Sequence, residues 1–261
     1  MSFTVQDIRT YSDSPPLTML TAYDAPTASL VEEAGIDIIL VGDSMGNAVL
    51  GYDTTIPVTM EEILSRTAAV VRGTDDTLIV ADMPFLSVGT DRQTSIENCG
   101  TVLKETGADA VKIECGSHTV DLTQDLVELG IPVMAHLGLT PQRVKELGGY
   151  AQQGDSPQEA QRILDLARQH ESAGAFALVL EHIPAKLAAE ITEELSIPTI
   201  GIGAGNDCNG QVLVFNDVVG LNEWAPSFAK QFGDVRGEIL SAVEEYADSV
   251  RSGSFPNSEE E

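Results

Sequence analysis

The chain has 261 residues, 43% of them hydrophobic, which is enough to build a sizeable core and excludes a chain that is disordered throughout. Its 41 Asp and Glu residues against 14 Lys and Arg residues give a formal net charge of −27 at pH 7. A surface of this charge repels phosphate backbones and anionic lipid headgroups, so we expect neither nucleic acid nor a membrane as a partner.

Short apolar runs rich in Val and Ile recur along the chain, separated by amphipathic segments of roughly 10 to 15 residues. A continuous apolar run, unlike an alternating one, indicates a strand that is buried on both faces, which is typical of a parallel sheet. In chain order, the predicted strands cover residues 17–22, 36–41, 78–81, 110–113, 131–135, 176–180, 199–202 and 212–215. The predicted helices cover residues 26–34, 60–71, 93–106, 119–129, 157–173, 184–195 and 226–250.

Eight strands that alternate with helices in a chain of this length predict the α/β class and a single (β/α)8 TIM barrel. An open, doubly wound parallel sheet is the alternative. We expect the barrel domain to cover residues 1–251. Residues 252–261, which end in three glutamates, are expected to form a flexible acidic tail.

Charged residues follow or end several of the predicted strands. In a parallel barrel the carboxyl ends of all strands open on one face, where the active site lies, so we expect these side chains to meet at one mouth. The alternative is that the acids only cap the helices that follow them. The residues are Asp43 with its neighbour Ser44, then Asp82, Glu114, His136 and Glu181.

Carboxylates gathered at one mouth repel one another, and some would stay protonated. A divalent cation removes this conflict, and oxygen donors without a nearby cysteine favour Mg²⁺ over zinc or copper. His136 is either a further ligand or, as we favour, a residue that orients its neighbours by hydrogen bonding.

Lys112 lies inside an apolar run, two residues before Glu114, so both side chains point to the same face of the strand. One explanation is a structural ion pair with an acid. The other is an ammonium that binds the carboxylate or carbonyl of an anionic substrate. Only five lysines occur in the chain, which favours a functional role for one inside the barrel.

The excess of acids is spread along the chain and has two explanations. One is a moderately acidic cytosolic enzyme. The other, which we favour, is adaptation to a salt-rich cytoplasm, where counter-ions screen the repulsion between the acids. In that case the charge describes the solvent and not the substrate.

Cysteine usage fits a cytoplasmic location. Cys99, Cys115 and Cys208 form no Cys-x-x-Cys pair, which argues against a zinc site or a disulfide framework. No uncharged apolar stretch is long enough to span a membrane, and the first residues contain no apolar leader segment.

The residues at the strand ends belong to nine short segments whose order and spacing are distinctive. Together they resemble the ketopantoate hydroxymethyltransferase (3-methyl-2-oxobutanoate hydroxymethyltransferase) family over about residues 19–246. The segments are Thr21-Ala-Tyr-Asp24, Leu40-Val-Gly-Asp-Ser44, Pro57-Val-Thr59, Ala81-Asp-Met-Pro-Phe85, Val111-Lys-Ile-Glu114, His136-Leu-Gly-Leu-Thr-Pro-Gln142, Gly148-Gly-Tyr150, Leu178-Val-Leu-Glu181 and Ile200-Gly-Ile-Gly-Ala-Gly-Asn206.

The resemblance implies a barrel of the phosphoenolpyruvate/pyruvate type in a large homo-oligomer, with a decamer suggested by the family. It implies transfer of a hydroxymethyl group to 3-methyl-2-oxobutanoate, giving ketopantoate for pantothenate and coenzyme A biosynthesis. The implied donor is 5,10-methylenetetrahydrofolate, or another reduced pterin. The implied roles are Mg²⁺ binding by Asp43, Asp82 and Glu114, substrate binding by Asp43, Ser44, Asp82 and Lys112, and proton acceptance by Glu181.

The chemistry of the residues agrees with this reaction. A 2-oxo acid chelates Mg²⁺, the metal stabilises the enolate formed when a proton leaves C3, and a glutamate is a suitable base. Two alternatives stay open. A Mg²⁺-dependent lyase or mutase of the same superfamily would act on a C–C or C–P bond of a 2-oxo acid without a pterin. A non-catalytic protein would bind the 2-oxo acid without needing a base such as Glu181.

Overall fold

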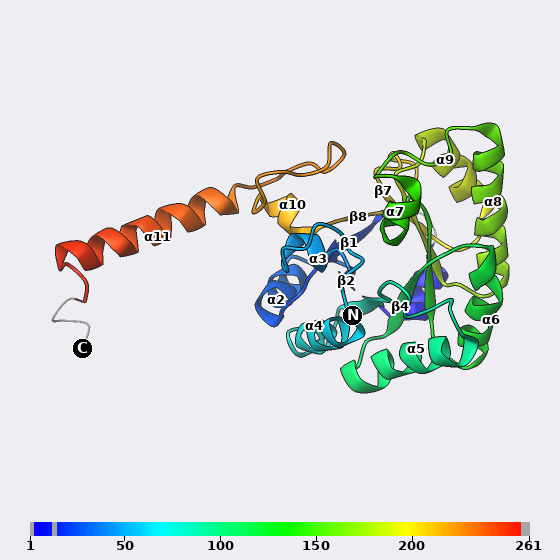
Figure 1. The fold of residues 1–261 in the computed structure, drawn as a ribbon, viewed down its shortest axis with the longest axis horizontal. Coiled ribbons are helices and arrows are strands. Elements are labelled where there is room, and N and C mark those ends of the chain that lie inside the picture. Colours follow the sequence, from blue (N-terminus) through cyan, green and yellow to red (C-terminus); the bar gives the residue numbers. More distant parts are fainter. Residues whose placement is uncertain (1–2, 12–14, 257–261) are drawn as a thin grey trace. The chain divides into compact units, whose positions relative to one another are not determined.

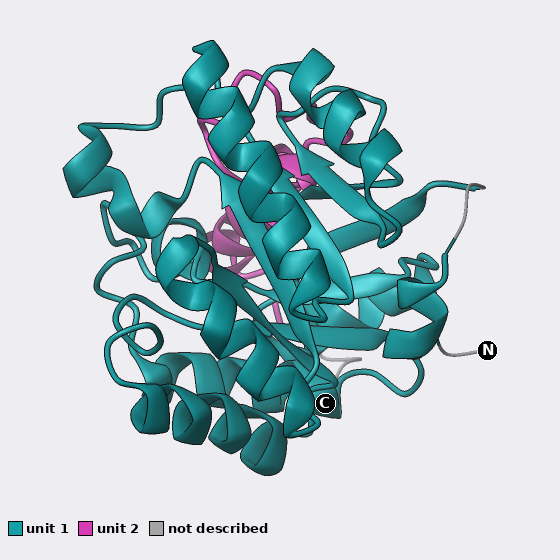
Figure 2. Cartoon of the chain, turned by 90° about the vertical axis from the view of Figure 1, so that its right-hand side faces the viewer, with its two compact units in different colours: residues 1–214 teal, residues 215–261 magenta. Residues whose placement is uncertain are grey.

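The computed structural model describes residues 3–11 and 15–256. By their internal contacts the residues of the chain form two compact units, 1–214 and 215–261 (Figure 2). The expectation of one domain over residues 1–251 stays a prediction. The expected acidic tail, residues 252–261, lies partly outside the described residues, which end at residue 256.

The first unit contains a closed barrel of eight parallel strands that follow one another in chain order (Figure 1). Closure is made by the first and last strands, where Met19 pairs with Val212. The predicted (β/α)8 barrel is therefore confirmed, and the open sheet is wrong. The strands are β1 (Leu17–Thr21), β2 (Ile38–Val41), β3 (Leu78–Asp82), β4 (Ala110–Glu114), β5 (Val133–Gly138), β6 (Ala177–Glu181), β7 (Thr199–Ile202) and β8 (Gly210–Leu213).

Helices follow one another around the outside of these strands (Figure 1). The six longer ones are α2 (Ala25–Glu33), α4 (Met60–Arg72), α5 (Arg92–Thr106), α6 (Val120–Glu128), α8 (Pro157–Ser172) and α9 (Ala185–Glu194), each close to its predicted range. Their starts have local causes: at α4, the Thr59 hydroxyl accepts a hydrogen bond from the backbone N–H of Glu62, and the Glu62 carboxylate accepts one from the Thr59 N–H.

The periodicity of the sequence did not predict the shorter helical segments. These are α1 (Val5–Arg9), η1 (Ser117–Thr119), α3 (Met45–Ala48), η2 (Pro141–Arg143) and α7 (Val144–Leu147). A helix of one turn buries too few apolar residues to leave a periodic pattern. Between β7 and β8 the described residues 203–209 form no helix.

The barrel interior is filled by alternate residues of the strands, because successive side chains of a strand point to opposite faces. The central cluster includes Val80 of β3, Ala110 of β4, Met134 of β5 and Val179 of β6, with Ile8 of α1 packed into it. Two positions further along the same strands, the side chains point to the same interior face and are polar. These residues are Asp82, Lys112, His136 and Glu181, so the next layer of the barrel interior is polar.

The second unit contains α10 (Phe215–Val219) and α11 (Val235–Ser252). The helix predicted over residues 226–250 starts too early. The chain from 220 to 234 is irregular, and α11 begins after Asp234, whose carboxylate accepts a hydrogen bond from the Gly237 N–H at 3.0 Å. None of the side chains of α11 is buried. No helix among the described residues is both long and apolar enough to cross a membrane.

Candidate active site

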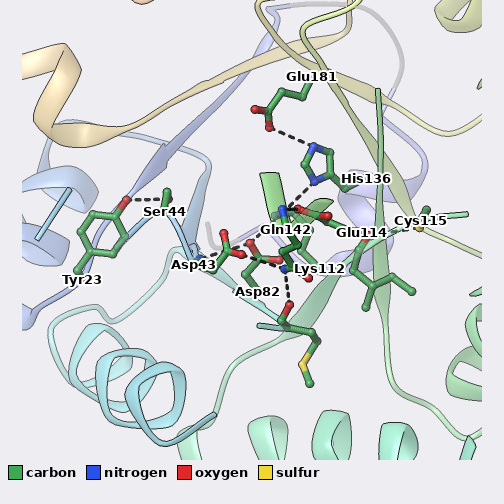
Figure 3. A network of polar contacts seen from close by, with 12 residues as sticks. Tyr23, Asp43, Ser44, Asp82, Lys112, Glu114, Cys115, His136, Gln142 and Glu181 are labelled. Atoms are coloured by element: carbon green, nitrogen blue, oxygen red, sulfur yellow. Dashed lines mark hydrogen bonds and ion pairs between the residues drawn. The ribbon is translucent and has the colours of Figure 1, made fainter. Parts of the chain in front are cut away.

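Seven polar residues predicted at or near the strand ends lie together at the carboxyl end of the barrel (Figure 3). Asp82, Glu114 and Glu181 are the last residues of their strands, and Lys112 and His136 lie within β4 and β5. Together with Asp43 and Ser44, which follow β2, all of them line one cavity of about 100 Å³. The structure thus brings together every site residue named from the sequence.

The acids of this cavity do not cap the helices that follow them, so the capping alternative is wrong. After β3, the next helix is capped by Asp91, and after β6 the residue before α9 is Pro184. The short α3 follows Ser44 and has no side-chain cap. The carboxylates of Asp43, Asp82 and Glu181 instead contact side chains from other strands and loops.

Lys112 forms a buried ion pair with Asp82, with 2.9 Å between Nζ and Oδ2. The two side chains are 6% and 2% exposed. Burial alone would lower the pKa of Lys112, but the carboxylates of Asp82 and Asp43 outweigh it and raise that pKa above its ordinary value. The lysine is therefore an ammonium throughout the physiological pH range.

His136 links this ammonium to Glu181. Burial, and then the charge of Lys112, lower the pKa of His136 below its ordinary value, so the imidazole is neutral. The ammonium donates to Nδ1 across 3.3 Å, which leaves the ring proton on Nε2. Nε2 lies 3.1 Å from Glu181 Oε2, a close contact whose direction is not that of a full hydrogen bond. His136 thus orients both partners, and neither of its nitrogens is free for a cation.

The backbone at Glu181 is fixed by a glycine of the neighbouring strand. Gly138 pairs with Glu181 at the end of β5 and has a φ of +98°. A Cβ atom on Gly138 would lie 2.2 Å from the Glu181 carbonyl oxygen, so only glycine fits there. That oxygen instead accepts a hydrogen bond from the Leu139 N–H at 2.8 Å.

Asp43 and Glu114 share a partner that sequence reasoning missed, Gln142. Its amide Nε2 lies 2.9 Å from Asp43 Oδ2, and its backbone N–H donates to Glu114 Oε1 at 3.0 Å. A neutral side chain gives no signal in a search for charged residues, although Gln142 ends one of the nine segments.

Burial, and then the charge of Asp82, raise the pKa of Asp43 to about 7. Burial and then Asp43 raise the pKa of Glu114 well above its ordinary value.

Two buried carboxylate oxygens of this cavity, Asp82 Oδ1 and Glu114 Oε2, have no hydrogen-bond partner among the described residues. An unpartnered buried carboxylate oxygen is costly, and a cation with oxygen ligands would satisfy both. No group of three or more His, Cys, Asp or Glu side chains in the described part is arranged to hold a metal ion. Mg²⁺ usually keeps several of its waters and takes one or two carboxylates directly.

Tyr23 is a second residue near the site that the sequence did not single out. The Tyr23 hydroxyl lies 2.9 Å from Ser44 Oγ, and Tyr23 is only 2% exposed. Cys115 is also close to the site, but burial raises the pKa of its thiol to about 12, so it is no nucleophile at neutral pH.

The other parts of the cavity wall are mostly apolar. Besides Thr21, Thr55 and Pro141, they are formed by side chains of β2, β6, β7 and β8 and of the residue after β8, namely Leu40, Val179, Ile202, Val212, Leu213 and Val214. A small cavity with carboxylates and an ammonium on one side and branched aliphatic side chains on the other suits a small acid that carries an aliphatic branch.

Solved structures with the same fold catalyse several different reactions. The chain superposes on phosphonopyruvate hydrolase in complex with oxalate and Mg²⁺ with a TM-score of 0.63, at 16% identity, covering 99% of this chain and 93% of the other. For 2,3-dimethylmalate lyase, a member of the PEP mutase/isocitrate lyase superfamily, the TM-score is 0.60 at 15% identity, with 98% and 90% covered. At such identities the likeness shows the fold alone.

Sequence relatives are much closer. The chain is 65% identical over 253 residues to the 3-methyl-2-oxobutanoate hydroxymethyltransferase of Haloarcula marismortui, covering 97% of this chain and 94% of the relative. It is 52% identical over 256 residues to the enzyme of the same name from Thermotoga maritima, with 98% and 94% covered. Residues 2–258 match the pattern of one family. The chain therefore belongs to the ketopantoate hydroxymethyltransferase family.

Proposed function

We propose that the chain transfers a hydroxymethyl group to 3-methyl-2-oxobutanoate, giving ketopantoate, with 5,10-methylenetetrahydrofolate or another reduced pterin as the donor. The observation that carries this proposal is the division of one cavity into three parts. Carboxylates with unpartnered oxygens form the first, Glu181 against neutral His136 forms the second, and the apolar wall forms the third.

Asp43, Asp82 and Glu114 would hold Mg²⁺, directly or through water. When bound, the ion supplies a Lewis acid that takes the 2-oxo and carboxylate oxygens of the substrate and stabilises negative charge on the 2-oxo oxygen. The unpartnered oxygens Asp82 Oδ1 and Glu114 Oε2 support this assignment.

Lys112 would bind the substrate as a hydrogen-bond donor. An ammonium has three N–H groups. One points to Asp82 at 2.9 Å and a second to His136 at 3.3 Å, so the third is free for an oxygen of the substrate. Ser44, oriented by Tyr23, would contribute a further contact. The isopropyl group of the substrate would then lie against the apolar wall.

Glu181 would accept the proton from C3 of the substrate. It ends β6 two residues after Val179, which belongs to the apolar wall, so the carboxylate and the wall face the same space. The side chain is 17% exposed, whereas that of His136 is 2% exposed, so a proton on Glu181 can exchange with water at the mouth. Once C3 carries the negative charge, it forms a bond to the methylene carbon of the donor as one of the two C–N bonds of that carbon breaks. Water then supplies the hydroxyl group as the second C–N bond breaks, and the two nitrogens of the released pterin take up one proton from C3, by way of Glu181, and one from the water.

The lyase or mutase alternative and the non-catalytic alternative are not favoured, because the close relatives carry the transferase name. We retain three expectations as part of the proposal: a large homo-oligomer, of which a decamer is the expected form, a cytoplasmic location, and adaptation to salt.

The test is exchange of the C3 proton of 3-methyl-2-oxobutanoate in deuterated buffer with Mg²⁺, followed by NMR without any pterin. Wild-type protein should exchange the proton. Glu181→Gln should still bind the 2-oxo acid but exchange about 10²-fold more slowly, the usual scale for loss of a general base.

A suitable control is Glu190→Gln, which makes the same change at an exposed position of α9, the helix after β6. Exchange at the wild-type rate in folded Glu181→Gln would mean that another residue is the base. If wild-type protein with Mg²⁺ leaves the C3 proton in place, the proposed reaction is wrong.

A further inference from the structure

Gln142 is a buried side chain without charge in a cavity otherwise dominated by ionisable groups. It is 8% exposed and lies in η2, the single 3₁₀ turn that follows β5. Pro141 occupies the first position of this turn, which fixes the backbone just before Gln142. The residue therefore reaches the cavity from a short, constrained segment.

The contacts of Gln142 join the ends of three other strands. The two N–H groups of its amide reach Asp43 Oδ2 and the carbonyl oxygen of Met83, each at 2.9 Å. Its backbone N–H donates to Glu114 Oε1 at 3.0 Å. Asp43 follows β2, Met83 follows β3 and Glu114 ends β4, so one residue after β5 holds all three strand ends (Figure 3).

These partners also fix which way the amide points. A carbonyl oxygen and a carboxylate accept hydrogen bonds, so the NH₂ group, and not the amide oxygen, must face Met83 and Asp43. Because the amide is neutral, it orients the Asp43 carboxylate without cancelling its charge. At Asp82 the partner is the Lys112 ammonium, which does offset the charge.

We propose that Gln142 is a positioning residue for the cation site. It fixes one oxygen of Asp43 through its side chain and one oxygen of Glu114 through its backbone. The second oxygen of Glu114, Oε2, is thereby left buried and unpartnered for the cation or its water. This inference rests on the proposed function, because the cation is the one assigned there to Asp43, Asp82 and Glu114.

The test is Mn²⁺ binding to Gln142→Met, followed by electron paramagnetic resonance of the free ion. Methionine keeps the length of the side chain and the backbone N–H but removes both amide donors. We expect the Kd for Mn²⁺ to rise by about 10- to 100-fold, the usual effect of removing the hydrogen-bond partner of a metal ligand. Circular dichroism in excess chelator should show an unchanged fold.

The matched control is Gln124→Met. Gln124 is exposed on α6, and its amide donates to the Glu128 carboxylate at 2.7 Å, so the same kind of hydrogen bond is lost far from the cavity. Its Mn²⁺ affinity should equal that of the wild type. If Gln142→Met does not fold, Gln142→Asn decides, because an amide one methylene shorter cannot reach both acceptors and should also weaken Mn²⁺ binding.

Asp43→Asn separates the two proposals. Loss of Mn²⁺ binding in Asp43→Asn together with wild-type binding in folded Gln142→Met, or in Gln142→Asn where that variant decides, would overturn the positioning role and leave the cation site standing. Wild-type Mn²⁺ binding in Asp43→Asn would overturn the cation site, and with it the role of Gln142.

Discussion

The ammonium of Lys112 lies 2.9 Å from the Asp82 carboxylate, and both side chains are buried. Lys112 is the only buried lysine among the described residues. A buried pair of this kind contributes little net stability, because desolvation of the two charges offsets their attraction. Removal of one partner is different, because it leaves the other charge buried without compensation. The pair is therefore better explained by a role in binding the substrate and the cation than by a contribution to the stability of the fold.

We predict that Lys112→Met destabilises the protein by about 3–5 kcal/mol in chelator, and that adding Asp82→Asn recovers most of this loss. Urea unfolding of the single and double variants measures both effects. Lys186→Met, at an exposed position of α9, is the control and should change little. If Lys112→Met alone lowers the free energy of unfolding by less than about 1 kcal/mol, the prediction is wrong, because the variant would not leave Asp82 as an uncompensated buried charge.

The raised pKa of Asp43 predicts a pH dependence of stability in the metal-free protein. Its pKa is about 7 in the folded chain against an ordinary value of 3.8, so the folded state binds this proton more tightly. This tighter binding of the proton stabilises the folded state fully below the ordinary pKa of 3.8. The stabilisation is lost as the pH rises through the folded-state pKa of about 7. In chelator, the wild type should therefore lose stability relative to Asp43→Asn from about pH 4 to about pH 7, with no further change above it.

Urea unfolding at several pH values, expressed as wild type minus Asp43→Asn, isolates the contribution of Asp43 and of its interactions with Asp82 and Glu114, while the contributions of the more distant acids cancel. Above pH 7, Mg²⁺ should stabilise the wild type, because it binds the folded state, and should not stabilise the variant. A difference between the two proteins that does not change with pH would contradict the raised pKa.

Much of the fold and of the candidate site could be predicted from the sequence, for a physical reason. Strands buried on both faces must be continuously apolar, and a charged residue at the end of such a strand must lie at the mouth of the barrel. Lys112 was found because a cation inside an apolar run is conspicuous.

Residues that act through neutral hydrogen bonds were missed. Gln142 and Tyr23 have no charge, and their roles depend on which loops meet in space. The start of α11 was also wrong, because the apolar residues between 226 and 234 continue the pattern of the helix without being helical. Periodicity alone does not show where a helix is capped, and at α11 the cap is Asp234.

The apolar wall predicts a change in substrate preference. Val212 lines the cavity and is 4% exposed. Val212→Ala should enlarge the space for the aliphatic branch and shift kcat/KM toward 3-methyl-2-oxopentanoate over 3-methyl-2-oxobutanoate by about tenfold, the scale of one methylene group in an apolar site. Val102→Ala, at a buried position of α5, controls for general loss of packing. An unchanged ratio in Val212→Ala would place the branch elsewhere.

The last prediction concerns salt and follows from the net charge of −27. At about 10 mM salt the screening length is near 30 Å, so acids across the whole surface repel one another, whereas at about 1 M it is near 3 Å. The 14 Lys and Arg residues are far too few to pair the 41 acids, and several ion pairs, such as Arg251 with Asp248, lie on the surface, where they contribute little. Dilution from molar potassium chloride should therefore dissociate the expected oligomer first, with loss of activity and then of secondary structure.

Light scattering and circular dichroism across a salt series, with and without Mg²⁺, measure these steps. Millimolar Mg²⁺ should protect the wild type further by binding its folded state, and Asp43→Asn should lose this protection while keeping the response to potassium chloride. That contrast separates general screening of the surface from occupation of one site, because only the second depends on a single carboxylate. An oligomer and an activity that both persist at about 10 mM salt would show that the acidic surface is not an adaptation to salt.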